Sequence, residues 1–194
     1  AVDNAKSYEL AQQAIEESRQ RVSELSVLFS VSQSLAGAAM ESEEIANIIA
    51  QRFIELINIP DCSVSILDPE TSQLWILSEL ARSRDPARPA ELGPTERVGT
   101  SYDIIDSPAT RRVLESLAPI VIQANDPGVD PADQAYMWRN KIATMVIIPL
   151  AVSGQAIGVI RLEAWDVQRS LSSNQLNLSM IMANAAAVAL DNAR

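Results

Sequence analysis

The chain of 194 residues has 25 acidic and 15 basic residues, no histidine and one cysteine, Cys62. Its formal net charge of −10 opposes binding to nucleic acids. Without histidine the chain cannot form a Ser-His-Asp triad, a Cys-His catalytic pair, a Cys/His zinc site or a His-ligated haem.

Residues 5–36 are predicted to form one long helix, because no Pro or Gly interrupts them and apolar residues recur every seven positions. A helix of thirty residues spans about 45 Å, which is too long for one small domain to cover its apolar stripe. The pattern therefore favours a coiled coil in a homodimer. A helix folded back onto its own domain is the alternative. The main row of the heptad is Tyr8, Ile15, Val22 and Phe29.

A second helix is predicted after Ser42, which is expected to cap its N-terminus, and Pro60 is expected to end it. Residues 62–67 alternate in polarity and residues 74–77 are apolar, which predicts a β-hairpin. The proline-rich residues 82–99 are predicted to form an exposed loop.

Two short helices are predicted further on, each with a polar cap followed by proline, at Ser107-Pro108 and at Asp130-Pro131. Residues 120–122 are predicted to form a strand between these helices. With the remaining elements, this order indicates an α+β domain built in layers.

The clearest hairpin pairs residues 144–152 with residues 156–163 around Gly154. Ser172 and Gln175 then form a capping box that begins a final helix rich in Ala and Met.

Two segments resemble the GAF family of sensory domains. One is residues 147–160, with Pro149-Leu150 before the turn and Ile157-Gly158-Val159 after it, and the other is residues 185–194. The resemblance covers about residues 22–194. It implies an antiparallel sheet with the terminal helices on one face and a pocket on the other, roofed by loops and short helices. Residues 1–38 are then a linker helix, and residues 39–194 are the GAF domain.

The resemblance also implies a function. The chain is expected to be a non-enzymatic regulatory part of a cytoplasmic multidomain signalling protein, with a histidine kinase as the favoured parent, and to dimerise through its flanking helices. Expected partners are a second copy, neighbouring GAF or output domains and an unidentified small molecule, but no nucleic acid or membrane. The alternative is a relay domain without a functional pocket. The near match of residues 1–6 to residues 189–194 predicts a tandem array.

Known ligands of the family fit this sequence poorly. Phytochrome-type members attach a bilin through Cys and hold it with His, whereas this chain has no His and its Cys62 lies at the start of a strand. Asn140-Lys141 matches the beginning of a cyclic-nucleotide signature, but no Phe follows it. We therefore expect no cofactor.

The most specific candidate for a ligand contact is Arg161. Alternation along residues 157–163 puts Arg161 and Glu163 on the same strand face, which the resemblance identifies as the pocket side. Arg161 could therefore bind an anion. The alternative is a patch in which Arg161 and Glu163 are solvated or pair with each other.

Five further residues are candidates on weaker grounds. Tyr136 and Trp138 could stack on a flat ligand from the roof helix or only fill space. Ser65 could offer a hydroxyl or mark an exposed strand face, as could Ser63. Arg111 could reach an acidic ligand or be a surface charge, as could Arg112. The full set of candidate ligand contacts is Ser65, Tyr102, Arg111, Tyr136, Trp138 and Arg161.

Overall fold

A computed structural model describes residues 41–81, 97–165 and 168–193. The predicted coiled-coil helix over residues 5–36 lies outside these described residues, as does most of the predicted loop at residues 82–99. Among the described residues, no helix is both long enough and apolar enough to cross a membrane.

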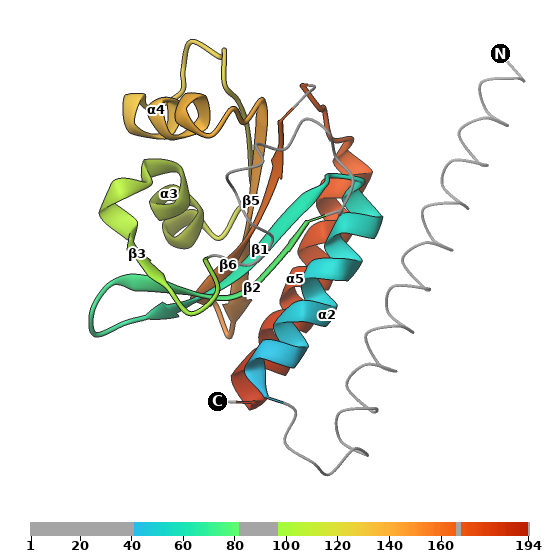
Figure 1. The fold of residues 1–194 in the computed structure, drawn as a ribbon. Coiled ribbons are helices and arrows are strands. Elements are labelled where there is room, and N and C mark those ends of the chain that lie inside the picture. The colour runs from blue at the N-terminus through green and yellow to red at the C-terminus, as the bar shows by residue number, and fades with distance from the viewer. Residues whose placement is uncertain (1–40, 82–96, 166–167, 194) are drawn as a thin grey trace, which may run out of the picture. The chain divides into compact units, whose positions relative to one another are not determined.

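The described residues form a six-stranded antiparallel sheet with helices on both faces (Figure 1). The strand order is β3-β2-β1-β6-β5-β4. The strands are β1 (Asp61–Asp68), β2 (Gln73–Ala81), β3 (Ser101–Asp103), β4 (Ile120–Gln123), β5 (Thr144–Val152) and β6 (Gln155–Ala164). The helices are α2 (Ser42–Ile57), the 3₁₀-helix η1 (Ile104–Asp106), α3 (Pro108–Ser116), α4 (Pro131–Arg139) and α5 (Ser173–Asn192).

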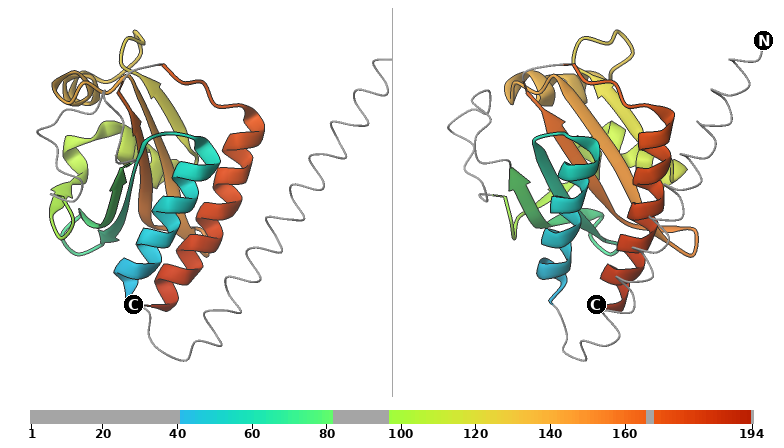
Figure 2. Two further views of the ribbon diagram at one scale, coloured as in Figure 1. Left: turned by 45° about the vertical axis from the view of Figure 1, so that its right-hand side comes forward. Right: turned by 90° about the vertical axis from the view of Figure 1, so that its right-hand side faces the viewer.

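The two faces of the sheet have different covers. Helices α2 and α5 lie side by side on one face, and α3 and α4 cover the other (Figures 1 and 2). The predicted α+β architecture is thereby confirmed. The short strand β3 and the helix η1 were not predicted, because three residues each are too few to show a period.

Strands β1 and β6 form the centre of the sheet, and their alternation decides what each face carries. Ser63 pairs with Arg161, and Cys62 pairs with Leu162, so these two pairs lie on opposite faces. A bulge in β2 leaves Leu77 without a partner in the register with β1. The bulge turns both Ile76 and Glu79 toward the face that carries Arg161.

Helices α2 and α5 form the helix layer, and the first residue of α2 lies next to the residue that follows α5. Ser42 is the first residue of α2, not the cap that the sequence suggests, because Glu41 takes the N-cap position and no side chain caps this helix. The Ser42 hydroxyl instead donates to the carbonyl oxygen of Ala193 at 3.5 Å, so the start of α2 adjoins the end of α5 (Figure 2). At the other end of α5, the capping box of Ser172 and Gln175 is present as predicted.

Candidate functional site

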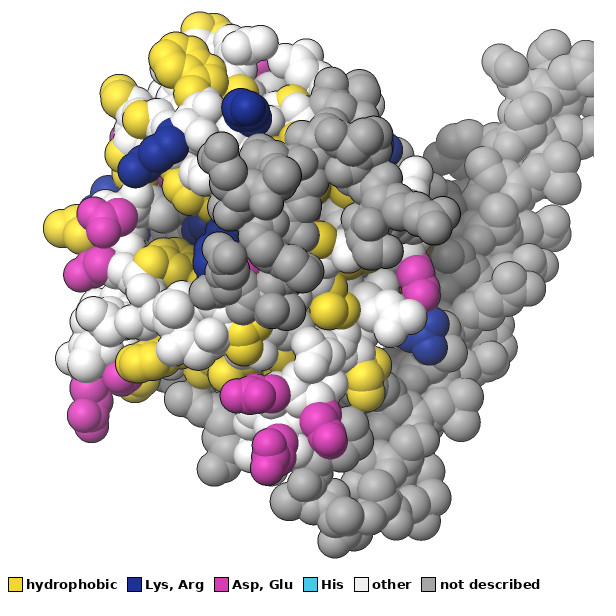
Figure 3. Space-filling view, viewed as in Figure 1, with side chains coloured by type: hydrophobic (Ala, Val, Ile, Leu, Met, Phe, Trp, Pro, Cys, Tyr) yellow, Lys and Arg dark blue, Asp and Glu magenta, His cyan; other side chains and the backbone are white. Residues whose placement is uncertain are grey.

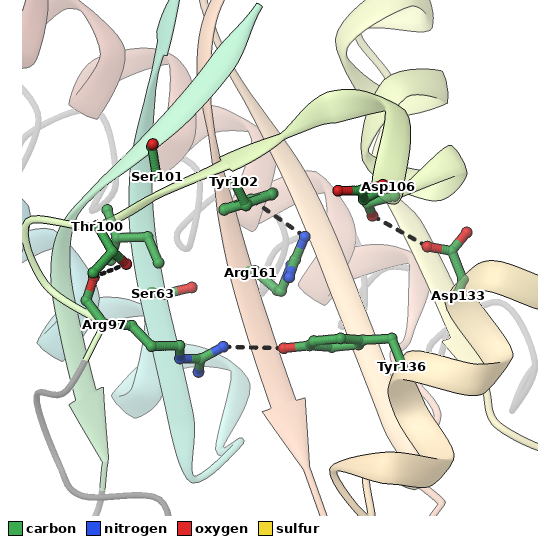
Figure 4. Close-up of a pocket in the computed structure, with 11 residues that line it drawn as sticks. Ser63, Arg97, Thr100, Ser101, Tyr102, Asp106, Asp133, Tyr136 and Arg161 are labelled. Carbon is green, nitrogen blue, oxygen red and sulfur yellow. Dashed lines mark hydrogen bonds between the residues drawn. The ribbon is translucent and has the colours of Figure 1, made fainter.

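A cavity of about 200 Å³ lies on the sheet face that α3 and α4 cover. Its walls come from β1, β2, β3, β6, η1, α4 and the segment before β3 (Figure 4). Polar side chains predominate in the lining, which consists of Ser63, Ile76, Arg97, Thr100, Ser101, Tyr102, Asp106, Ser107, Asp133, Tyr136 and Arg161.

Arg161 lies at the floor of this cavity, on β6, and is only 7% exposed. Its Nη2 donates to the hydroxyl of Tyr102 at 3.2 Å and to Oγ1 of Thr110 at 2.9 Å. Its Nε is buried and has no hydrogen-bond partner among the described residues. A buried donor without an acceptor is costly and uncommon, which makes Arg161 the most unusual group of the site.

Two aromatic rings accompany the Arg161 guanidinium. Its central carbon lies 4.9 Å from the ring centroid of Tyr102 and 5.5 Å from that of Tyr136, within the range of cation–π attraction. Burial alone lowers the pKa of Arg161, but the oxygens of Tyr102, Tyr136 and Glu163 outweigh burial and raise that pKa. Arg161 therefore stays charged inside the protein.

A second arginine pairs with the buried carboxylates of the site. Arg97 Nε donates to Oε1 of Glu79 at 2.9 Å, and Arg97 Nη2 lies 3.7 Å from Oε2 of Glu163. The Tyr136 hydroxyl donates to Glu163 Oε1 at 2.9 Å and accepts from Arg97 Nη1 at 3.0 Å. These contacts join β2, β6 and α4 across one end of the cavity.

Tyr136 provides a pH-dependent test of this arrangement. Burial and the charge of Glu163 raise the pKa of Tyr136 to about 12, above the ordinary value of about 10. The folded protein therefore holds this proton more tightly than the unfolded chain. The resulting stabilisation is complete below about pH 10 and is lost as the pH rises toward 12. Ultraviolet titration of tyrosinate is expected to show a late ionisation, which Tyr136→Phe removes and the control Tyr8→Phe leaves in place. A late step that survives in Tyr136→Phe would contradict the assignment.

Asp133 attaches the two roof helices to each other. Its Oδ2 accepts the backbone N–H of Ala109 at 2.8 Å, and its Oδ1 accepts the Ser107 hydroxyl at 3.1 Å. Asp133 is on α4 and is 2% exposed, whereas Ala109 is in the first turn of α3. The carboxylate thus satisfies an N–H that has no partner inside the helix.

The structure brings three of the six predicted residues to the cavity: Tyr102, Tyr136 and Arg161. Ser65 is buried on the same strand face but does not line the cavity, and Arg111 is exposed on α3. Trp138 is 61% exposed, because residues two apart on a helix point in different directions and Tyr136 takes the inward position. We do not propose these last three as contacts of a ligand in this cavity.

The structure also tests the alternative interpretation, in which Arg161 and Glu163 form a patch that is solvated or paired internally. Both side chains are buried, so the patch is not solvated. They do not pair with each other: Arg161 contacts Tyr102 and Thr110, whereas Glu163 contacts Arg97 and Tyr136. Ser63, which the sequence offered beside Ser65, does line the cavity. Sequence reasoning did not select the other seven lining residues, namely Ile76, Arg97, Thr100, Ser101, Asp106, Ser107 and Asp133.

The described residues hold no cluster of three or more His, Cys, Asp or Glu side chains that could bind a metal ion.

The family model of the GAF domain matches residues 39–191. The chain belongs to the GAF domain family. Family and fold are therefore as predicted. GAF domains are in general sensory or regulatory domains. No curated protein matches the sequence.

Solved GAF structures have the same fold at low sequence identity. The phycocyanobilin-bound GAF domain from a cyanobacterial phytochrome is 15% identical, with a TM-score of 0.68 over 92% of this chain and 94% of that chain. The GAF domain/HD domain protein from Geobacter sulfurreducens is 12% identical, with a TM-score of 0.62 over 78% of this chain and 93% of that chain. The chromophore-binding domain of bacteriophytochrome RpBphP3 from R. palustris is 14% identical, with a TM-score of 0.64 over 85% of this chain and 61% of that chain. These similarities show the fold alone.

Proposed function

We propose that this GAF domain is a ligand-sensing module of a cytoplasmic multidomain signalling protein, with a histidine kinase as the favoured parent. It performs no catalysis itself, and any catalytic output domain lies outside the chain. The observation that carries the proposal is the cavity beneath α3 and α4, with the charged Arg161 side chain at its floor. A concave cavity into which charged and hydroxyl side chains converge is a candidate site for a small molecule.

The second candidate function is a relay domain that dimerises and transmits without a ligand. A relay needs no cavity, and side chains would be expected to fill the space between sheet and roof. The open volume and the Nε of Arg161, which has no partner among the described residues, favour sensing.

Covalent attachment of a bilin does not fit these residues. Cys62 is buried on the sheet face opposite Ser63 and Arg161, so its thiol points toward the helix layer and away from the cavity. Burial, with the negative charges of Asp61 and Glu163, raises the pKa of the Cys62 thiol and disfavours the reactive thiolate. No histidine exists to hold such a chromophore.

In the mechanism that we propose, the sheet transmits the effect of ligand binding from the cavity to the helices on its other face. A ligand at Arg161 contacts β6, whose other face packs under α5, so binding can change the position of α5. The helix layer carries exposed apolar side chains, Ile48 on α2 and both Ile181 and Val188 on α5, that a second protomer could cover. Coupling requires that the ligand bind one helix arrangement more tightly than the other.

Native mass spectrometry of the freshly purified chain tests both parts of the proposal. We expect a dimer that retains a small molecule. The variant Ser63→Leu, which fills the cavity floor, is expected to stay dimeric and lose that molecule. The double variant Val22→Lys and Leu25→Lys, which places charges in the predicted coiled coil, is expected to be a monomer that retains it.

A wild-type dimer without any retained molecule, indistinguishable from Ser63→Leu, would favour the relay function. A double variant that remains dimeric would contradict dimerisation through the N-terminal helix.

A further inference from the structure

We propose that the cavity binds a small organic monocarboxylate, with the carboxylate group against the guanidinium of Arg161. This inference rests on the proposed sensory function and names the chemical class of its ligand.

The first argument is that the buried guanidinium of Arg161 has no carboxylate partner among the described residues. In residues 41–81, 97–165 and 168–193, ion pairs involve Arg52 and Arg97, and no carboxylate forms an ion pair with Arg161. The two partners of Arg161 Nη2 are neutral hydroxyls, and its Nε has no partner in this part of the chain. A buried cation is stable when it is paired and fully hydrogen-bonded, so a ligand anion supplies what the protein does not.

The second argument is that the acidic residues around the cavity are already engaged. Glu79 and Glu163 bind Arg97, and both oxygens of Asp133 accept hydrogen bonds from α3 and the residue that precedes it. Asp106 lines the cavity but is exposed. The cavity therefore has a favourable place for one negative charge beside Arg161. A second negative charge would meet Asp106 and Asp133, and this favours a monocarboxylate over a dicarboxylate.

The third argument is geometric. The central carbon of the Arg161 guanidinium lies 4.9 Å from the ring centroid of Tyr102 and 5.5 Å from that of Tyr136 (Figure 4), so these two rings limit the directions from which a new partner can approach. A planar carboxylate fits this approach. Ser63 is the cross-strand neighbour of Arg161 on the cavity side, and its hydroxyl can donate to the second carboxylate oxygen.

The fourth argument is size. The cavity of about 200 Å³ is below the usual range of about 300–1,000 Å³ for pockets that hold drug-sized ligands. It exceeds the space of a single ion or water, since one water takes about 30 Å³ of liquid. A ligand with a short carbon chain fits, its apolar end against Ile76 and the tyrosine rings.

Three four-carbon probes separate charge from size: butyrate, butyramide and succinate. We expect butyrate, titrated into the full 194-residue chain at constant ionic strength, to shift the Arg161 Nε–H resonance in ¹⁵N-arginine spectra. Because charge-assisted hydrogen bonds are roughly twice as strong as neutral ones, butyrate should bind at least about tenfold more tightly than neutral butyramide, and more tightly than succinate. This comparison uses the unaltered protein and does not depend on a variant that folds.

Two variants then assign the site. Arg161→Met is expected to abolish the preference for butyrate over butyramide, because it removes the cation and keeps most of the volume. Arg111→Met changes the same type of residue on the exposed side of α3 and is expected to leave that preference unchanged. Thermal unfolding of both variants verifies that each is folded before binding is compared.

Equal affinity for butyrate and butyramide, or a charge preference that survives in Arg161→Met, would overturn this inference. The cavity would remain the site of another ligand, and the sensory function would stand if native spectra still show a retained molecule. Succinate binding as tightly as butyrate would overturn the restriction to one carboxylate. Failure of all three probes, together with an empty protein in native spectra, would overturn both the inference and the sensory function.

Discussion

Gly158→Ala is expected to destabilise the domain more than any other single substitution considered for it. Gly158 lies on β6 opposite Ile66 of β1, and a Cβ atom at Gly158 would lie 2.1 Å from the carbonyl oxygen of Ser65. The obstacle is backbone in the central strand pair, so no side-chain rotation can relieve it. We expect a loss of more than about 4 kcal/mol in the free energy of unfolding, a large part of the total stability of about 5–15 kcal/mol for a typical domain.

Gly128→Ala is the matched control for this substitution. A Cβ atom at Gly128 meets no atom within 4 Å, so we expect a change within about 0.5 kcal/mol. Urea denaturation followed by circular dichroism measures both variants. A Gly158→Ala protein as stable as Gly128→Ala would show that β1 and β6 can separate locally without loss of the fold.

Arg97→Ala is expected to have the second largest effect. It removes the guanidinium from Glu79 and Glu163, whose side chains are 2% and 4% exposed. Breaking a buried ion pair by removing one partner costs about 3–5 kcal/mol. Because the Arg97 side chain is itself 29% exposed, water can partly replace it, and we expect a loss of about 3 kcal/mol.

Arg52→Ala provides a comparison with a similar pair at the surface. Arg52 and Glu55 are 3.0 Å apart, but their side chains are 66% and 48% exposed, so we expect a loss below about 0.5 kcal/mol. Adding Glu79→Gln to Arg97→Ala should recover part of the lost stability, since one buried charge is then removed. Equal losses for Arg97→Ala and Arg52→Ala in denaturant titrations would show that the Arg97 cluster is effectively solvated.

Local patterns predicted most of the fold, and three of the six predicted contacts line the cavity. Alternation along β6 is a period of two that the sequence shows directly, so the shared face of Arg161 and Glu163 was predictable. The same holds for the hairpin of β5 and β6 and for the capping box at Ser172. Each of these features depends on residues that are close in the chain.

The contacts that sequence reasoning missed join distant segments. Arg97 reaches Glu79 on β2, Tyr136 on α4 and Glu163 on β6, and no spacing in the sequence signals such a meeting. The exposure of Trp138 depends on how α4 is rotated over the sheet, which its own residues do not determine. Ser42 failed as a cap because Glu41 already occupies that position and the Ser42 hydroxyl instead contacts Ala193, which is distant in sequence.

The meeting of Ser42 and Ala193 has an architectural consequence. The start of α2 and the end of α5 are neighbours, so the described domain has its first and last helical turns at the same point of its surface. A movement of α2 near this point can therefore pass directly to α5, against which it packs.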